Sequence, residues 1–382
     1  MRSMEPSEKT NWVLIALLLL AGLFAAAQFG KLTLTLEPLQ LHYPEGGFFV
    51  PVLVSIVGMV GIALGAVAGS VVAGIGLTRV VLAGLFAGGV ISLAQTTLPS
   101  LPFFALLRIA EGVSHLAIVV AVPTLMASLS TDADRPFVMG IWAAFFGIAM
   151  AILALLLPTV LAQGGLALVF AGHGVGMILV GLVLWPLLPS MPRETSSKIR
   201  PVQEHRIIYS TPRLLIPGAG FVCYTIVYIA LLGVLPLARV LSTWDIAALP
   251  IISIFGTILG GWVAKSLAPE RLVGLGFLAT IGVTAVALVL RDAVWPLFLL
   301  FLVMAFIPAG SFASIPHFNT QPKDRARATG GLAQLGNVGT TLGTPLFVFA
   351  QQQGGFTAIC LLTITFCTMG LAVSRVIAKR IK

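Results

Sequence analysis

The chain has 382 residues, of which 58% are hydrophobic and 9% charged, and its formal net charge is +9. About a quarter of the residues of a soluble domain are charged. This composition and a mean hydropathy of +1.06 therefore exclude a soluble globular protein and indicate a polytopic membrane protein. The apolar runs are continuous and about 20 residues long, which favours membrane helices over the alternating strands of a β-barrel.

Twelve apolar runs follow one another along the chain, and each is long enough to cross a bilayer. The expected spans are residues 12–35, 48–74, 79–98, 101–128, 136–160, 166–188, 214–238, 246–264, 272–290, 294–316, 328–350 and 356–378. The segment 189–213 is rich in proline, serine and charged residues, which is typical of a linker. We therefore expect an N-terminal six-helix bundle in residues 1–188, a cytoplasmic linker in 189–213 and a C-terminal six-helix bundle in 214–382.

The basic residues predict the orientation of the spans. With the N-terminus inside, the cytoplasmic segments hold 18 of the 22 lysines and arginines, whereas the external loops hold only Arg239 and Arg291. The excess of Lys and Arg on one side marks the cytoplasmic face. We expect a multi-pass protein of the inner (cytoplasmic) membrane with both termini in the cytoplasm. The positive charge then reflects topology, and nucleic acid is not an expected partner.

The two halves of the chain repeat each other. The segment 133–153 aligns with 323–343 at an offset of 190 residues, and in both an Asp-Arg pair precedes a span. The segments 79–82 and 271–274 open the third and ninth spans at an offset of 192. Parallel repeats of six spans, with a substrate site between them, are typical of transporters.

Glycines indicate close contact between helices. Gly61, Gly65 and Gly69 lie four residues apart on one helix face, and the eleventh span is similarly rich in glycine. Faces of small residues let membrane helices approach closely. We therefore expect tight helix packing at these two spans.

With this span count, linker and repeat, the chain resembles the major facilitator superfamily from about residue 12 to 378. Gly69 and Gly76 stand where that family carries a loop motif, but Ala73 occupies the position of its aspartate and Lys265 occupies it in the second half. Arg108 with Gly112 resembles the fourth-span motif of the family, which is associated with proton coupling. The resemblance implies an all-α membrane protein with 12 transmembrane helices in two pseudo-symmetric six-helix bundles, in which spans one, four, seven and ten line a central cavity.

Three ionisable residues lie in the fourth span. Arg108, Glu111 and His115 are spaced so that they share one helix face. A charge near the centre of a membrane helix costs roughly 2.5–3.5 kcal/mol, so these groups need partners or an aqueous cavity. Arg108 and Glu111 form either a structural ion pair or a site in which Arg108 holds an anion and Glu111 exchanges a proton. His115 either extends this proton relay or serves packing.

Lys31 is the second unusual charge. It lies about 12 Å from the centre of the first span toward the outside, and Arg108 about 9 Å from the centre of the fourth. The two cations are thus at similar depth and, by the resemblance, both face the cavity and bind substrate. The alternative is that the stem of Lys31 carries its charge to the outer interface.

The second half has no charges at the positions that correspond to Arg108 and Glu111. Its polar candidates for substrate binding are Tyr224, Tyr228, Gln334 and Asn337, which alternatively make hydrogen bonds between helices. His173 and His317 are expected to be structural.

Catalysis is not indicated. The sequence has no nucleotide-binding glycine loop, no metal-ligand cluster and no nucleophile-base arrangement, and Cys223, Cys360 and Cys367 lie in apolar runs where they pack as small hydrophobes. We expect no enzyme activity, no cofactor and no metal.

Together these features predict a monomeric secondary transporter that moves a small anion, coupled to protons, by alternating access. Lys31 and Arg108 favour an anion, and Glu111 favours proton symport. The alternatives are a proton-driven exporter of amphiphilic drugs and a membrane receptor or scaffold, the latter disfavoured because the sequence shows no extramembrane domain.

Overall fold

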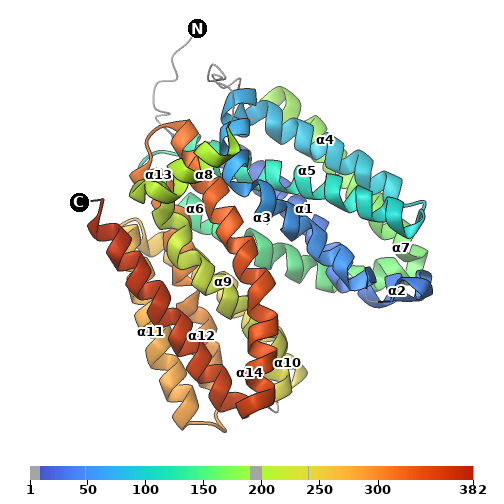
Figure 1. The fold of residues 1–382 in the computed structure, drawn as a ribbon. Coiled ribbons are helices and arrows are strands. Elements are labelled where there is room, and N and C mark those ends of the chain that lie inside the picture. The colour runs from blue at the N-terminus through green and yellow to red at the C-terminus, as the bar shows by residue number, and fades with distance from the viewer. Residues whose placement is uncertain (1–8, 48, 190–199, 240, 382) are drawn as a thin grey trace.

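The computed structural model describes residues 9–47, 49–189, 200–239 and 241–381. Within these ranges the chain forms α-helices and one short 3-10 helix, and no strand. Figure 1 shows the helices in two bundles that form a V, with its vertex near α8 and α13. The protein is an all-α membrane protein built of two pseudo-symmetric six-helix bundles, as the sequence predicts.

The N-terminal bundle contains the first seven α-helices. They are α1 (Trp12–Leu34), α2 (Leu36–His42), α3 (Phe49–Ile75), α4 (Leu77–Gln95), α5 (Leu101–Ser128), α6 (Arg135–Ala143) and α7 (Phe145–Leu187), with the 3-10 helix η1 (Pro44–Gly46) after α2. The helix α8 (Pro201–Ser210) follows, and the C-terminal bundle comprises α9 (Pro212–Ala238), α10 (Thr243–Val263), α11 (Pro269–Val289), α12 (Trp295–Met304), α13 (Phe306–Phe318) and α14 (Pro322–Lys379).

Among the described residues, ten stretches of helix, one of them α12 with α13, are long and apolar enough to cross a membrane. Two of the ten, α7 and α14, turn at a pair of glycines, Gly164–Gly165 and Gly354–Gly355, and each therefore supplies two spans. Gly165 and Gly355 have φ angles of +60° and +56°, which favour glycine because it has no Cβ. The two corners are 190 residues apart, the offset of the sequence repeat, and they bring the number of spans to twelve.

Local sequence explains where the helices begin. Prolines occupy the first turn of α5, α6, α9, α11, α12 and α14, where a missing N–H is not needed for the helix. The side chain of Asn11 accepts a hydrogen bond from the backbone of Leu14 and so caps α1. Ser242 and Asp245 form a reciprocal capping box at the start of α10.

Glycines hold the two bundles together at the vertex of the V. A Cβ on Gly69 would collide with the backbone of Ala326, and one on Gly65 would lie 2.7 Å from Cβ of Gln334. Gly140 of α6 and Gly261 of α10 likewise meet backbone to backbone. The predicted close packing at the second and eleventh spans is therefore confirmed, and it occurs between the bundles.

Polar contacts support this inter-bundle contact. Lys265, which stands where the family motif has an aspartate, lies 3.0 Å from Asp134 of the other bundle. Glu204 of α8 accepts hydrogen bonds from Arg327 at 2.9 and 2.8 Å and from Ser70. The family's loop motif has an aspartate where this chain has Ala73. Here the carboxylate in the contact next to that position is that of Glu204, on α8.

The predicted linker 189–213 contains α8, so it is not wholly without regular structure, and residues 190–199 lie outside the described residues. The domain boundaries at 188 and 214 stay predictions.

The Glu204 contact leads to a pH-dependent prediction. Burial raises the pKa of the Glu204 carboxyl, but the hydrogen bonds from Arg327 and Ser70 and the charge of Arg327 lower it more, and the net pKa is below its ordinary value. The ionised Glu204 therefore stabilises the contact between the bundles fully at a pH above the ordinary carboxyl pKa. This stabilisation is lost as the pH falls through the lowered pKa of Glu204. We expect spin labels at exposed Ile75 and Gln321 to move apart in that acidic range.

At neutral pH, Glu204→Gln should lengthen the distance between the same labels, measured by double electron–electron resonance. Asp292→Asn, a change at an exposed carboxylate, is the control and should leave the distance unchanged. An unchanged distance in Glu204→Gln would show that the other contacts between the bundles keep the vertex closed without the Glu204 carboxylate.

Candidate functional site

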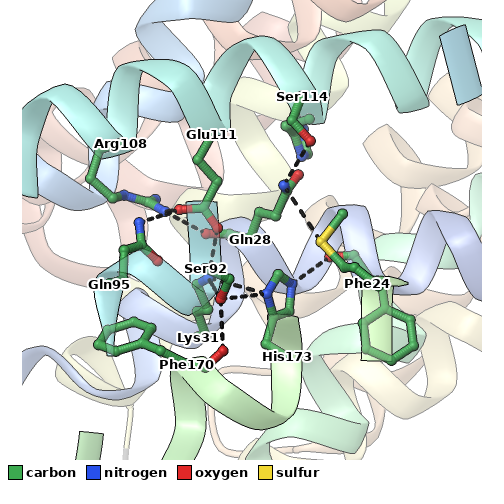
Figure 2. Close-up of polar contacts among 12 residues, drawn as sticks. Phe24, Gln28, Lys31, Ser92, Gln95, Arg108, Glu111, Ser114, Phe170 and His173 are labelled. Atoms are coloured by element: carbon green, nitrogen blue, oxygen red, sulfur yellow. Dashed lines mark hydrogen bonds and ion pairs between the residues drawn. The ribbon is translucent and has the colours of Figure 1, made fainter. Parts of the chain in front are cut away.

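The structure brings the three charges predicted from the first and fourth spans together. Figure 2 shows the Glu111 carboxylate between Lys31 and Arg108. One oxygen of Glu111 lies 2.6 Å from Lys31 Nζ, and the other accepts a hydrogen bond from Arg108 Nη1. Gln95 of α4 donates to this second oxygen at 2.7 Å. We call Lys31, Arg108 and Glu111 the charged cluster.

Arg108 is held by backbone as well as by Glu111. Its Nε donates to the carbonyl of Leu53 at 3.1 Å, and its Nη1 donates to the carbonyl of Gln28 at 2.9 Å. Its Nη2, although buried, has no hydrogen-bond partner among the described residues. A buried donor without a partner costs about 1–3 kcal/mol, so Nη2 is an unused hydrogen-bond donor in the cluster.

Lys31 uses all three of its N–H groups. Besides Glu111, its Nζ donates to Ser92 Oγ at 2.8 Å and lies 3.2 Å from Nδ1 of His173. The other ring nitrogen of His173 lies 3.0 Å from the carbonyl of Phe24. Because a carbonyl only accepts, Nε2 carries the proton of the neutral ring, and Nδ1 accepts from Lys31. Phe170 adds a cation–π contact, with its ring centre 5.2 Å from Nζ.

The charged cluster is sealed inside the N-terminal bundle. The side chains of Lys31, Arg108 and Glu111 are fully buried, and their partners come from α1, α3, α4, α5 and α7. The expectation that both cations face a central cavity is therefore wrong. Lys31 does not reach for the outer interface either, since Nζ is buried with its partners. Two cations and one carboxylate leave the cluster with a formal charge of +1.

The remaining residues predicted for the site lie elsewhere. His115 directs Nδ1 to the carbonyl of Ala25 at 2.8 Å, one helical turn beyond Glu111. Tyr224 and Tyr228 stack on each other in the core of the C-terminal bundle.

Gln334 and Asn337 belong to the contact between the bundles. Gln334 donates to the carbonyl of Ile62 at 2.5 Å, and a Cβ on Gly61 would collide with Asn337. The structure thus brings together Lys31, Arg108 and Glu111, and not the second-half candidates.

The sequence reasoning missed Gln28, Ser92 and Gln95, and it assigned His173 a structural role. All four are polar residues inside apolar spans, and this feature of the sequence identifies them as candidates for the site. Gln28 also lies one helical turn from Lys31. Their convergence depends on how α4 and α7 are rotated in the bundle, which hydrophobic runs do not reveal.

A pocket adjoins the buried charged cluster on one side, where Lys31 is one of its lining residues. It has a volume of about 310 Å³ and is lined by α1 and by both halves of α7. Of the described residues that line it, Lys31 and His173 alone have polar side chains. The pocket therefore joins an apolar wall to the cationic end of the cluster.

Comparisons with known proteins agree with this architecture. A family model described as Major Facilitator Superfamily matches residues 18–346. No curated protein sequence matches the chain.

Solved structures with a similar fold include three transporters. The proton:xylose symporter XylE is 15% identical, with a TM-score of 0.74 over 97% of this chain and 96% of that one. The E. coli fucose:proton symporter FucP is 13% identical, with a TM-score of 0.75 over 96% of this chain and 98% of that one. The human organic anion transporter MFSD10 is 13% identical, with a TM-score of 0.73 over 95% of this chain and 98% of that one. At these identities the likeness concerns the fold.

The charge balance of the cluster predicts unequal effects of two substitutions. Glu111→Gln leaves two buried cations without a carboxylate, and removal of one partner from a buried ion pair costs about 3–5 kcal/mol. Lys31→Met leaves the Arg108–Glu111 pair balanced and should cost less. Adding Lys31→Met to Glu111→Gln should restore part of the lost stability, because it removes one of the two opposed cations.

Thermal unfolding of the protein in nanodiscs measures this order. Glu37→Gln, at an exposed carboxylate, is the control. The prediction is contradicted if the two single variants lose equal amounts of thermal stability and the double variant loses their sum. The charges would then not act on each other.

Proposed function

Because the chain belongs to the Major Facilitator Superfamily, whose model matches most of its length, we propose that it is a proton-coupled secondary transporter of a small anionic solute. The family and the transporter neighbours make it a transporter and not an enzyme. The proposed partners are the anion, protons and the lipid bilayer, and the transporter works as a monomer.

The charge of the cluster is the observation that supports an anion. Lys31 and Arg108 outnumber Glu111, and all three are fully buried. An uncompensated charge in a low-dielectric interior is costly, so a second negative group at the cluster is favoured. The unpartnered Nη2 of Arg108 offers such a group a hydrogen bond. A cationic drug would add to the excess positive charge, and this argues against the exporter of cationic amphiphiles.

Glu111 supplies the coupling to protons. An anion that approaches Lys31 competes with Glu111 for the same ammonium group, which Glu111 contacts at 2.6 Å. A buried carboxylate that loses a cationic partner becomes stable by taking up a proton. Anion binding and protonation of Glu111 then favour each other, as symport requires. Two of the similar structures are proton symporters, and a third is an organic anion transporter.

The contact between the bundles supports alternating access. The bundles touch through Gly65, Gly69, Gly140 and Gly261 at one end and diverge toward the other (Figure 1). The closed end carries Asp134, Glu204, Lys265 and Arg327, on the side where basic residues are abundant. We take this end as the cytoplasmic side of an inner-membrane protein, with both termini there, and the described state as open to the outside.

Transport measurements test the proposal. In proteoliposomes, uptake of radiolabelled organic anions should rise when an inward proton gradient is imposed. Glu111→Gln should abolish the response to the gradient, because the variant has no carboxylate to protonate. Lys31→Met should raise the half-saturating anion concentration about tenfold or more, since hydrogen bonds to charged groups contribute roughly 1.5–3 kcal/mol.

His115→Gln is the matched control for the relay that the sequence predicts. Its described hydrogen bond goes to the Ala25 carbonyl, so the variant should keep the gradient response. Anion uptake by the wild type that ignores the gradient would contradict proton coupling, and a complete lack of anion uptake would contradict the proposed substrate class.

A further inference from the structure

The residues that line the pocket beside the charged cluster differ in exposure, from an exposed mouth to a buried floor. At the mouth, Leu20, Leu156 and Leu168 have 38%, 56% and 40% of their surface exposed. Toward the floor, Ala27 and Val169 are buried. On α1 the lining runs from Leu20 to Lys31, which corresponds to about 16 Å of helix. Along α1 the lining therefore passes from exposed Leu20 to Lys31, whose side chain lies against the pocket but has no surface exposed to solvent.

The walls belong to one bundle only. The described lining residues all come from α1 and the two halves of α7, and none of them comes from the C-terminal bundle. These helices are membrane spans, and the exposed mouth residues are leucines. An apolar mouth on membrane spans of one bundle suits an apolar ligand that enters from the lipid.

The floor differs from the walls in charge. Lys31 and His173 form it, with Nζ of Lys31 3.2 Å from Nδ1 of His173. Behind Lys31 lie Glu111 and Arg108, which complete a group of formal charge +1. A lipid chain alone fits the walls but leaves this charge uncompensated, whereas a ligand with an anionic head and an apolar tail complements both.

We propose that this pocket binds an amphiphilic monocarboxylate, whose alkyl tail lies between α1 and α7 and whose carboxylate reaches Lys31. The proposal rests on the proposed function and narrows its substrate class from small anions to lipophilic ones. The cavity of about 310 Å³ is at the lower end of small-molecule sites, which suits a short to medium alkyl chain. The carboxylate of the ligand approaches Lys31 from the pocket and competes with Glu111, on the other side, for the charge of Lys31.

A series of straight-chain carboxylates tests this assignment. Binding of butanoate, hexanoate, octanoate and decanoate is measured on the full-length protein in nanodiscs, with the corresponding alcohols as uncharged probes. Burial of each methylene should strengthen carboxylate binding roughly fourfold until the pocket is full. The alcohols should bind more weakly at every length, because they do not compensate the charge at Lys31.

Gly172 allows the pocket to be filled without disturbing the helix. A Cβ at Gly172, a lining residue, would have no atom within 4 Å, so Gly172→Leu places its side chain in open space. Gly282 of α11 is the matched control, since it is also an exposed helical glycine at which an added Cβ would meet no atom within 4 Å. Gly172→Leu should weaken binding by a factor that grows with chain length, and Gly282→Leu should bind like the wild type.

The comparison of the two variants removes the effect of partition into lipid, which is the same for both. If Gly172→Leu weakens carboxylate binding by the same factor at every chain length, the alkyl tail does not lie between α1 and α7. Alcohols that bind as tightly as carboxylates would show that the pocket holds any chain and that the head does not reach Lys31. If short anions are transported in a Lys31-dependent way but the pocket variant has no effect, this inference fails and the proposed function stands. If no carboxylate of any length binds, this inference fails, and the uptake of other anions in proteoliposomes decides the proposed function.

Discussion

The buried imbalance of two cations and one carboxylate is the constraint on which the N-terminal bundle depends. Lys31, Arg108 and Glu111 have no access to solvent, so every polar atom near them must be satisfied by protein. The surrounding helices supply partners to Lys31 through Ser92 and His173. They leave Arg108 Nη2 and the amide oxygens of Gln28 and Gln95 without a hydrogen-bond partner among the described residues. A fully compensated cluster would be a static structural element. One that lacks a negative charge fits the proposed function, in which an arriving anion supplies that charge.

The contact between the bundles depends on close packing more than on buried charge. It combines backbone approach at glycines with a few charge pairs at the edge. Because most of the glycine contacts are made by backbone atoms, few side chains besides Gln334 and Asn337 have to separate when the helices part. The charge pairs also stabilise the contact between the bundles. One of their carboxylates, that of Glu204, lies on α8, which belongs to neither bundle. The bundles are thus held by contacts that are individually reversible.

The sequence predicts the fold well and the site in part. Apolar runs, basic residues and the 190-residue repeat suffice for twelve spans because each depends only on local composition. The depth of Lys31 and Arg108 follows from helix rise, and their meeting at Glu111 agrees with it. What helical periodicity does not contain is the rotation of each helix in its bundle. For that reason the inward orientation of the cluster, and the roles of Ser92, Gln95 and His173, emerge only in three dimensions.

The corner at Gly164–Gly165 joins these two parts of the molecule mechanically. It has only two non-helical residues, so the fifth and sixth spans have no slack between them. The chain before the corner meets α10 at Gly140, and the chain after it places His173 beside Lys31. Both arms also form the walls of the pocket. In the proposed alternating-access cycle, a rocking movement of the bundles would therefore displace the walls and the floor of the pocket together.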